Sequence, residues 1–377
     1  MGTTVFTATP ARAHPPASVY GPLAWTRKNL FGSWGSTAVT LALGWLLVVW
    51  TVDFLQWAVI NAVWTVPVGA NNIPDTSSCR ALRGGGACWA VIAEKYRFIL
   101  FGRFPYDEQW RPAICIALFI ALFIVSALRR FWRWELSLVW IVTLSLIGVL
   151  MWGGVLGMEA VPQDVWGGLP ITLILATFGL AFAFPLSILV ALGRRSAKLP
   201  AVRLICVVYV ELIRGVPLIS LLFMASVMFP LFLPEGVNID KLLRAQIAII
   251  LFAAAYLAEV VRGGLQALPR GQYEAADALG LSYWKKTSLI ILPQALRLVI
   301  PPLVNTFIGF FKDTSLVLII GIFDLLTAGK IAVTEPAWQG FATEVYIALA
   351  GIYFVFCFAL SRYSRGLESE FNRANRR

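Results

Sequence analysis

The stretch EAADALGLSYWKKTSLIILP, residues 274–293, begins with polar residues in a chain that is otherwise strongly apolar. Apolar runs precede it (IAIILFAAAYLAEVV) and follow it (LRLVIPPLVNTFIGFF). Residues 272–279 are good helix formers, and Gly280 stands where a helix commonly ends with a positive φ. Ser282 is placed to cap a second short turn. We therefore predict a bent helical projection between two membrane spans.

The composition is that of a membrane protein. Of 377 residues, 59% are hydrophobic and 14% are charged, with a mean hydropathy of +0.77. A soluble domain has about a quarter charged residues, so we predict an all-α polytopic membrane protein. The net charge of +11 is typical of loops that face anionic lipid. We expect membrane lipid, and no nucleic acid, as the partner of these cations.

Windows of about 20 apolar residues predict about eight transmembrane helices. Two of the windows, 203–233 and 290–320, are too long for one straight span and must tilt, kink or break. The predicted spans lie near residues 37–57, 112–128, 136–157, 168–192, 203–233, 244–263, 290–320 and 343–361.

Lysine and arginine are concentrated in alternate loops, which predicts the cytoplasmic side. The loops MEAVPQDVWG and PEGVNID contain neither residue type. This bias places both termini, and residues 274–293, on the cytoplasmic side of a multi-pass membrane protein. We predict a disordered cytoplasmic tail at residues 1–36 without a cleaved signal peptide. We also predict a long periplasmic loop at residues 58–111 and a short cytoplasmic tail at residues 371–377.

The sequence lacks the common motifs of enzymes. It contains no GxxxxGK[ST], GxSxG or HExxH, so a P-loop or one of these hydrolytic sites is not predicted. His14, the only histidine, stands in the predicted tail, which argues against a histidine metal site. We expect no cofactor, no metal site and no catalytic residue in this chain.

Cys79 and Cys88 differ from the other three cysteines, which fall within predicted spans. They stand in CRALRGGGAC within the loop at residues 58–111, where three glycines allow a short ring to close. On the oxidising side of a bacterial membrane this pair is a candidate disulfide. Two free thiols are the alternative.

Ionisable side chains within spans are costly and therefore commonly functional. Five qualify here: Glu211, Arg214, Glu259, Arg262 and Lys312. Glu211 and Arg214 stand three residues apart on one predicted helix, and so do Glu259 and Arg262. Two neutralising ion pairs are therefore the alternative to a functional role.

The polar stretch carries a specific spacing: EAA at 274–276, Gly280, Ile290 and LP at 292–293. This spacing matches the EAA loop of binding-protein-dependent ABC importer permeases. YVELIRGVPLISLLF, LPQALRLVIPPLVN and KDTSL resemble the polar amino acid branch of that family, which includes histidine, arginine and glutamine permeases. The three preceding spans, with a long loop after the first, resemble the long permease subunits of general L-amino acid transporters.

The resemblance implies a MetI-like permease core of five helices at residues 167–370, after a three-helix extension at residues 37–166. It implies that the polar stretch is a cytoplasmic coupling helix. The implied partners are a cytoplasmic ABC ATPase dimer that binds ATP and Mg²⁺, a second permease subunit, a periplasmic amino-acid-binding protein and the L-amino acid substrate. The residues that the resemblance assigns to ATPase coupling are Glu274, Ala275, Ala276, Asp277 and Gly280.

An amino acid zwitterion in a low dielectric needs both of its charged ends matched. We therefore predict a substrate pathway in which Glu259 lies near the ammonium group and Arg214 near the carboxylate. Gly215 and Pro217 interrupt the span 203–233, and a half-helix beginning there would direct free N–H groups at the carboxylate. Lys312 is a third candidate.

Two other functions remain open. A scaffold or regulatory subunit could dock an ATPase without carrying substrate. A membrane enzyme is the other possibility, against which the missing motifs argue. The charged residues within spans favour transport.

Overall fold

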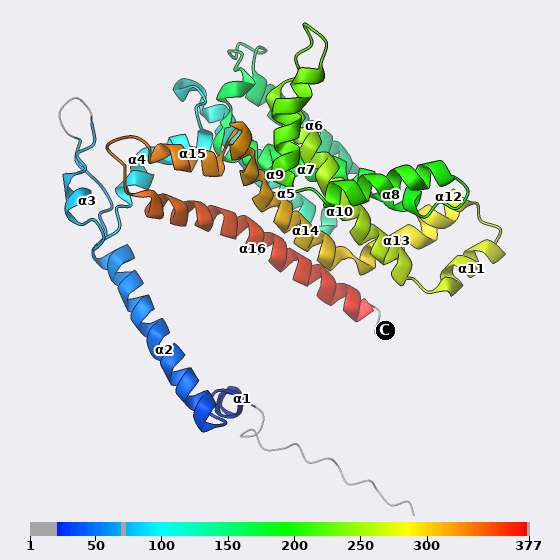
Figure 1. The fold of residues 1–377 in the computed structure, drawn as a ribbon, viewed down its shortest axis with the longest axis horizontal. Coiled ribbons are helices and arrows are strands. Elements are labelled where there is room, and N and C mark those ends of the chain that lie inside the picture. The colour runs from blue at the N-terminus through cyan, green and yellow to red at the C-terminus, as the bar shows by residue number, and fades with distance from the viewer. Residues whose placement is uncertain (1–20, 69–72, 375–377) are drawn as a thin grey trace, which may run out of the picture. The chain divides into compact units, whose positions relative to one another are not determined.

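The computed structural model describes residues 21–68 and 73–374, with side chains to residue 369. Helices make up nearly all of this part of the chain (Figure 1). The chain divides into one compact unit that ends at Trp89 and a second that begins at Ala90. His14 and most of the predicted N-terminal tail lie outside the described residues.

The first unit contains α1 (Pro22–Asn29), α2 (Trp34–Leu55), a π-helical turn (Gln56–Ile60) and α3 (Ser77–Ala81). The predicted disorder is wrong for residues 22–36, because α1 and the start of α2 lie there. Proline in the first turn pre-sets φ for a helix. At the start of α2, the backbone and side chains of Ser33 and Ser36 form a reciprocal capping box.

Helix α2 is apolar on all sides, and none of its residues is buried within its own unit. With the π-helical turn it forms the first candidate span, residues 34–60. A helix that is hydrophobic all round and exposes that surface matches a lipid environment. The span predicted at 37–57 therefore corresponds to α2.

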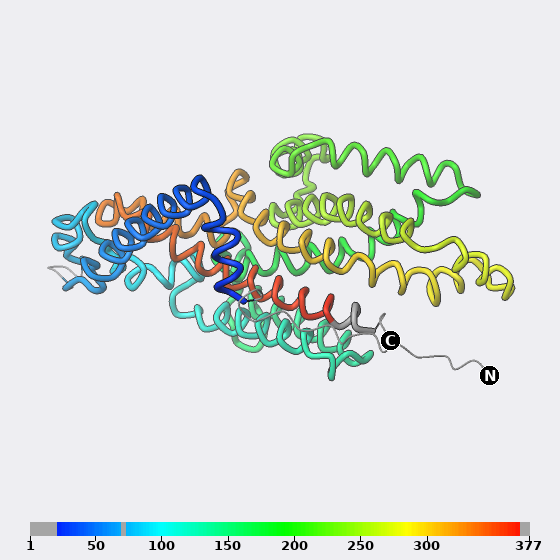
Figure 2. The backbone as a smooth tube through the Cα atoms, turned by 90° about the horizontal axis from the view of Figure 1, so that it is seen from below, coloured from blue at the N-terminus to red at the C-terminus, as the bar shows by residue number. Residues whose placement is uncertain are grey.

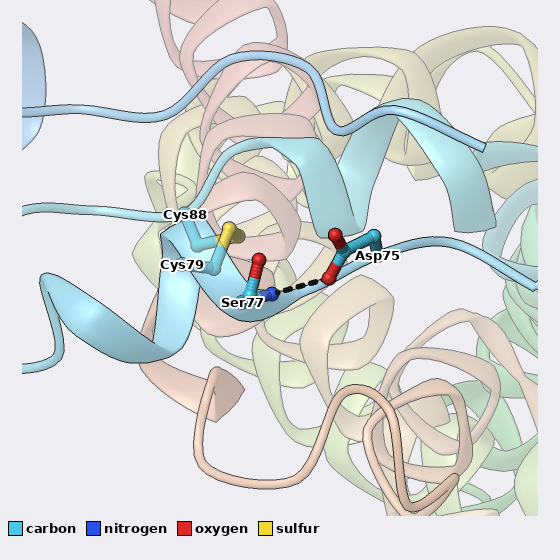
Figure 3. Close-up of a disulfide and its surroundings, with 4 residues drawn as sticks. All are labelled: Asp75, Ser77, Cys79 and Cys88. Atoms are coloured by element: carbon cyan, nitrogen blue, oxygen red, sulfur yellow. Dashed lines mark hydrogen bonds between the residues drawn. A yellow bond between two sulfur atoms is a disulfide. The ribbon is translucent and has the colours of Figure 1, made fainter. Parts of the chain in front are cut away.

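The loop after α2 contains a disulfide between Cys79 and Cys88, whose Cα atoms are 5.5 Å apart (Figure 3). Both cysteines are buried. Nearby, the backbone N–H of Ser77 donates to Asp75 over 3.0 Å. This hydrogen bond lowers the pKa of the Asp75 carboxyl group. The disulfide and this turn order the loop locally.

We expect non-reducing peptide mapping of isolated membranes to recover residues 79 and 88 as one cross-linked species. Alkylation before reduction should then label only the other cysteines, of which the structure has three free: Cys115, Cys206 and Cys357. Closing a loop of this length stabilises a fold by about 2–3 kcal/mol. Recovery of alkylated Cys79 and Cys88 from membranes prepared without reductant would contradict the disulfide.

The second unit is a helical bundle that includes the remaining candidate spans. Its helices are α4 (Ala90–Phe101), α5 (Trp110–Ala127), α6 (Trp134–Trp152), α7 (Gly168–Arg194), α8 (Pro200–Arg214), α9 (Leu218–Phe223), α10 (Lys241–Ala267), α11 (Arg270–Ala278), α12 (Tyr283–Lys286), α13 (Leu292–Leu298), α14 (Ile300–Asp313), α15 (Leu325–Ala332) and α16 (Ala342–Ala374), with the two-residue strand β1 (Phe323–Asp324) before α15.

Helices α7 and α10 form the centre of this unit, and α16 lies along α14 (Figure 1). Both helices bury small residues among larger ones. Ala253, Ala254 and Ala258 of α10 are completely buried, and Gly179 of α7 lies where a Cβ atom would be 2.9 Å from Ile249. Small residues let transmembrane helices approach closely, which is how such helices gain packing energy in lipid.

The described residues hold seven helices long and apolar enough to cross a membrane, or up to eight if a bent pair is one span. The bent pair is α8 with residues 218–232, and its halves meet at 104°. The predicted span 203–233 is therefore broken. Pro217 explains the break because it lacks an N–H and disfavours helix at the preceding residue.

Three other spans differ from the predicted bounds. The window 290–320 divides at Val299 into α13 and a span of residues 300–320. Helix α6 ends at Trp152 because Gly153 turns the chain with φ +69°. Helix α16 continues to Ala374, so the predicted tail at residues 371–377 begins within a helix.

The compact units do not divide at residue 166, where the extension was predicted to end. Helices α4 and α5 pack against α7, and α4 also packs against α15. The predicted loop 58–111 contains α3 and α4. At the junction, backbone bridges join Gly102 to Trp166 and join Gly167 and Gly168 to β1. The second half of the extension therefore belongs to the same compact unit as residues 167–370, the predicted core.

A buried aspartate fixes the start of α15. Asp324 accepts hydrogen bonds from the backbone N–H groups of Leu326 and Thr327 over 3.1 and 3.0 Å. Its burial raises the pKa of its carboxyl group, and the hydrogen bonds from Thr327 oppose that shift. The N–H of Leu325 donates to Thr172 of α7 over 3.1 Å. The bond to Thr172 attaches the start of α15 to α7.

We expect Gly168→Ala to lower the free energy of unfolding by about 3 kcal/mol, since overpacking and strained backbone each cost about 1–3 kcal/mol. Gly168 has φ +69°, and a Cβ atom there would be 2.1 Å from the carbonyl oxygen of Leu100. Thermal unfolding in detergent measures the effect. Gly148→Ala is the matched control because a Cβ atom on Gly148 of α6 meets nothing within 4 Å. Equal unfolding temperatures for the two variants would contradict the expectation.

Candidate functional site

Helix α11 connects directly to α10 through Leu268 and Pro269, both in extended conformation. It ends in a Schellman turn: the N–H of Gly280 donates to Asp277 and the N–H of Leu281 donates to Ala276. Gly280 has φ +68°, which favours glycine in this position. Figure 1 and Figure 2 both place α11 and α12 at one end of the second unit.

Two hydrogen-bonded pairs and one buried alanine hold α11 in place. Gln294 donates to Gln272 over 3.0 Å, and Lys286 donates to Asp277 over 2.5 Å. Ala276, which the resemblance assigns to ATPase coupling, is 1% exposed and packs inside its own chain. Ser282 begins α12 but its side chain makes no capping hydrogen bond, which corrects the predicted cap.

The outer surface of this segment combines charge with large apolar groups. Glu274 and Ala275 of α11 are exposed, and Glu274 has no ion pair among the described residues. The side chains of Leu279, Tyr283 and Trp284 are 75%, 51% and 67% exposed. Exposed apolar groups beside charged ones are typical of protein-binding surfaces.

A second group of functional candidates lies where α7, α8 and α10 meet. We call it the charge cluster. Its acidic members contact arginines from more than one helix: Arg194 donates to Glu211 over 2.8 Å and to Glu259 over 2.7 Å. Arg262 donates to Glu259 over 3.0 Å from its Nε atom and also forms an ion pair with it. The charge cluster consists of Arg194, Glu211, Arg214, Glu259 and Arg262.

The structure confirms one of the two ion pairs suggested by spacing and contradicts the other. Glu259 and Arg262 are paired on α10. Glu211 does not pair with Arg214, three residues away on α8, because Arg194 from the end of α7 reaches it instead. Arg194 was not among the functional residues predicted from the sequence. Its position in the last turn of an apolar helix was the feature of the sequence that could have indicated an ion pair with Glu211 and Glu259.

Arg214 is the most loosely held cation of the charge cluster. Its nearest acidic atom is an oxygen of Glu259 at 3.9 Å, and its side chain is 37% exposed. The guanidinium carbon lies 5.5 Å from the centre of the Tyr256 ring. Because most of its N–H groups are uncommitted, Arg214 can bind a further anion. The two oxygens of Glu259, in contrast, are both occupied by arginines.

The other predicted pathway residues occupy separate positions. Gly215 and Pro217 form the break between α8 and α9. Helix α9 is regular for only six residues before a π-helical turn. Lys312 is exposed on α14, and no ion pair or hydrogen bond joins its side chain to the charge cluster within the described chain. The structure therefore brings Arg214 and Glu259 together and leaves Lys312 apart.

Among the described residues, no group of three or more histidine, cysteine, aspartate or glutamate side chains is arranged to hold a metal ion. The charge cluster offers carboxylates that are already paired with arginines. The charge cluster can therefore form ion pairs and bind charged groups.

Comparison with known proteins assigns a family to the part of the chain that contains these elements. Residues 183–372 match the family described as "Binding-protein-dependent transport system inner membrane component". The chain belongs to this family. The match extends from within α7 to within α16 and includes the charge cluster and α11. A member of this transport family is a multi-pass membrane protein, and the predicted all-α permease fold is confirmed.

Two similar permease proteins match this chain along nearly all of its length. It is 49% identical over 370 residues to the inner membrane amino-acid ABC transporter permease protein YhdY of Escherichia coli (strain K12), covering 96% of this chain and 97% of that protein. It is 39% identical to the glutamate/glutamine/aspartate/asparagine transport system permease protein BztC of Rhodobacter capsulatus, covering all of both chains. A solved amino acid ABC transporter with histidines is 32% identical, covering 54% of this chain and 92% of that chain, with a TM-score of 0.48.

Proposed function

We propose that this chain is the permease subunit of a binding-protein-dependent ABC importer that carries L-amino acids across a bacterial inner membrane. The family match and the amino-acid permeases that resemble the chain support the substrate class. The observation that carries the proposal is α11 with its Schellman turn. This short helix presents Glu274, which has no ion pair in the described part of the chain, and the exposed apolar side chains of Leu279 and Trp284 follow it on the turn and on α12.

In this proposal α11 lies in the cytoplasm, together with both termini. The charges near α11 support this orientation: Arg195, Lys285 and Lys286 stand at the same end of the bundle as α11, and such residues favour the cytoplasmic side. A cytoplasmic ATPase dimer docks on α11 and binds ATP with Mg²⁺. Its closure moves α11 and shifts the spans between inward-facing and outward-facing states.

Two further partners complete the transporter. A periplasmic amino-acid-binding protein delivers the substrate, and a sister permease supplies the other half of the pathway. The charge cluster has three arginines and two glutamates, and 3 − 2 leaves one positive charge in excess. A substrate carboxylate fits this excess. Arg214 is its binding residue, because its guanidinium is the least committed of the three.

Glu259 remains a proposed pathway residue, but its role is to hold arginines in position, whereas Arg214 binds the substrate. To bind a substrate ammonium group, one of its oxygens would have to release an arginine, since both are paired. Its ion pairs suit a role in fixing Arg214 and Arg262. Lys312, Gly215 and Pro217 stay proposals for the pathway, and the exposure of Lys312 leaves it open to a ligand.

Reconstitution in vesicles tests the proposed function. Vesicles containing this chain, the sister permease and the ATPase should accumulate labelled L-amino acids when the binding protein and ATP are supplied. Omission of this chain should abolish uptake. A scaffold subunit predicts that the other subunits still transport without it, and uptake by those vesicles would contradict a permease role.

A further inference from the structure

Two consecutive arginines stand at the end of α7, where Arg194 is the last helical residue and Arg195 follows it. Arg194 contacts the charge cluster, and Arg195 contacts α11. Arg194 donates to Glu211 of α8 over 2.8 Å and to Glu259 of α10 over 2.7 Å. Arg195 donates to the hydroxyl oxygen of Tyr273 on α11 over 2.8 Å. One end of α7 therefore touches both the charge cluster and the coupling helix.

Arg195, Tyr273 and the carbonyl group of Leu265 are joined pairwise by hydrogen bonds, which connect α11 to the ends of α7 and α10. Arg195 donates to Tyr273 and also to the carbonyl oxygen of Leu265 near the end of α10 over 3.0 Å. The hydroxyl group of Tyr273 donates to the same carbonyl oxygen over 2.8 Å. The guanidinium carbon of Arg195 lies 5.2 Å from the centre of the Tyr273 ring. Hydrogen bonds to a charged donor are about twice as strong as neutral ones, so this set resists separation.

The chain itself connects α11 to α10 through two residues that belong to neither helix. Leu268 and Pro269 are extended, so α11 is not a continuous helical extension of α10. The Arg195–Tyr273 contact adds a second connection, by side chains, to a different helix. Adjacent Cα atoms are about 3.8 Å apart, so a displacement of Arg195 also displaces Arg194.

We propose that Arg194 and Arg195 form a relay that transmits movement of α11 to the charge cluster. This inference rests on the proposed function. When α11 moves with its partner, Tyr273 pulls the end of α7 through Arg195, and Arg194 then loosens or tightens on Glu211 and Glu259. Both arginines act as positioning residues: they set the place of Glu259, and through it of Arg214, and do not contact the substrate.

Tyr273→Phe is the mildest test, because it removes one hydroxyl group and keeps the ring. We measure ATP hydrolysis and uptake by the complete transporter in vesicles, with and without loaded binding protein. Basal hydrolysis should stay within about twofold of the unmodified transporter, while uptake per ATP hydrolysed falls by about tenfold, as expected for the loss of a charge-assisted hydrogen bond. Arg195→Ala should give the same loss, and Arg195→Lys should restore part of it.

Arg203→Ala is the matched control. Arg203 is an exposed arginine of α8, and its side chain has no ion pair or hydrogen bond among the described residues. This variant removes the same charge near the same end of the bundle and should keep normal uptake per ATP. The double variant Tyr273→Phe with Arg195→Ala should be no worse than Arg195→Ala alone, since both changes break one connection.

Normal uptake per ATP in both Tyr273→Phe and Arg195→Ala would overturn the relay and leave the proposed function intact. If Arg195→Ala prevents assembly, Tyr273→Phe decides the question by itself. A loss of uptake in Tyr273→Phe that is matched by an equal loss of basal hydrolysis would indicate a structural contact and contradict the relay. Failure of the unmodified transporter to take up any amino acid would overturn the proposed function, and the relay with it.

Discussion

Replacing Gly280 with leucine is expected to reduce uptake to background while the protein still inserts and folds. Gly280 has φ +68°, where an L-residue costs about 1–2 kcal/mol. A Cβ atom there would meet nothing within 4 Å in this chain, so the bundle itself is not disturbed. The Schellman turn that sets the angle between α11 and α12 relaxes, and a bulky side chain enters the surface offered to the ATPase.

Uptake and ATP hydrolysis in vesicles measure this effect. Hydrolysis should lose its response to loaded binding protein, because a misdirected α11 no longer connects the ATPase to the spans. Gly280→Asn is the control, since asparagine tolerates positive φ better than leucine, and it should retain most uptake. Gly271→Ala serves as a second control on the same helix, where a Cβ atom also meets nothing within 4 Å. Normal stimulated hydrolysis and uptake in Gly280→Leu would contradict the coupling role.

Arg214→Gln is expected to lower uptake by about 10- to 100-fold, the range for loss of a charge-assisted hydrogen bond. Its physical basis is that Arg214 keeps most of its donors uncommitted, with only a 3.9 Å contact to Glu259. The unfolding temperature should change little, since that contact is long and the side chain is 37% exposed. The measurement is the substrate concentration for half-maximal uptake, together with thermal unfolding in detergent.

Glu259→Gln should lower the unfolding temperature, unlike Arg214→Gln. Its carboxylate is 22% exposed and holds Arg194 and Arg262, so its loss leaves unbalanced positive charge at membrane depth. Breaking such a partly buried pair costs about 3 kcal/mol or more, and the unfolding temperature should fall clearly. A variant that keeps its unfolding temperature and loses uptake would instead support the predicted contact with the substrate ammonium. Unchanged uptake in Arg214→Gln would remove Arg214 from the pathway.

Several features of the fold follow from local sequence. Apolar runs of sufficient length predict spans because every backbone polar group in lipid must be satisfied within its own helix. Pro217 predicts the break after α8 because its own lack of an N–H causes it. Gly280 ends α11 in the conformation that glycine favours. In each case the residue that causes the feature lies within a few positions of it, so the feature can be predicted from the sequence alone.

The partners of the charges were decided only by the tertiary structure. Spacing on one helix paired Glu211 with Arg214, but Glu211 is bound by Arg194, 17 residues away, and Glu259 by the same arginine, 65 residues away. Tyr273 meets Arg195 across 78 residues. Local periodicity determines which face of a helix a side chain occupies, whereas contacts between helices depend on how α7, α8 and α10 pack. That packing includes the close approach of Gly179 on α7 to Ile249 on α10, and a single sequence does not show that these two residues meet.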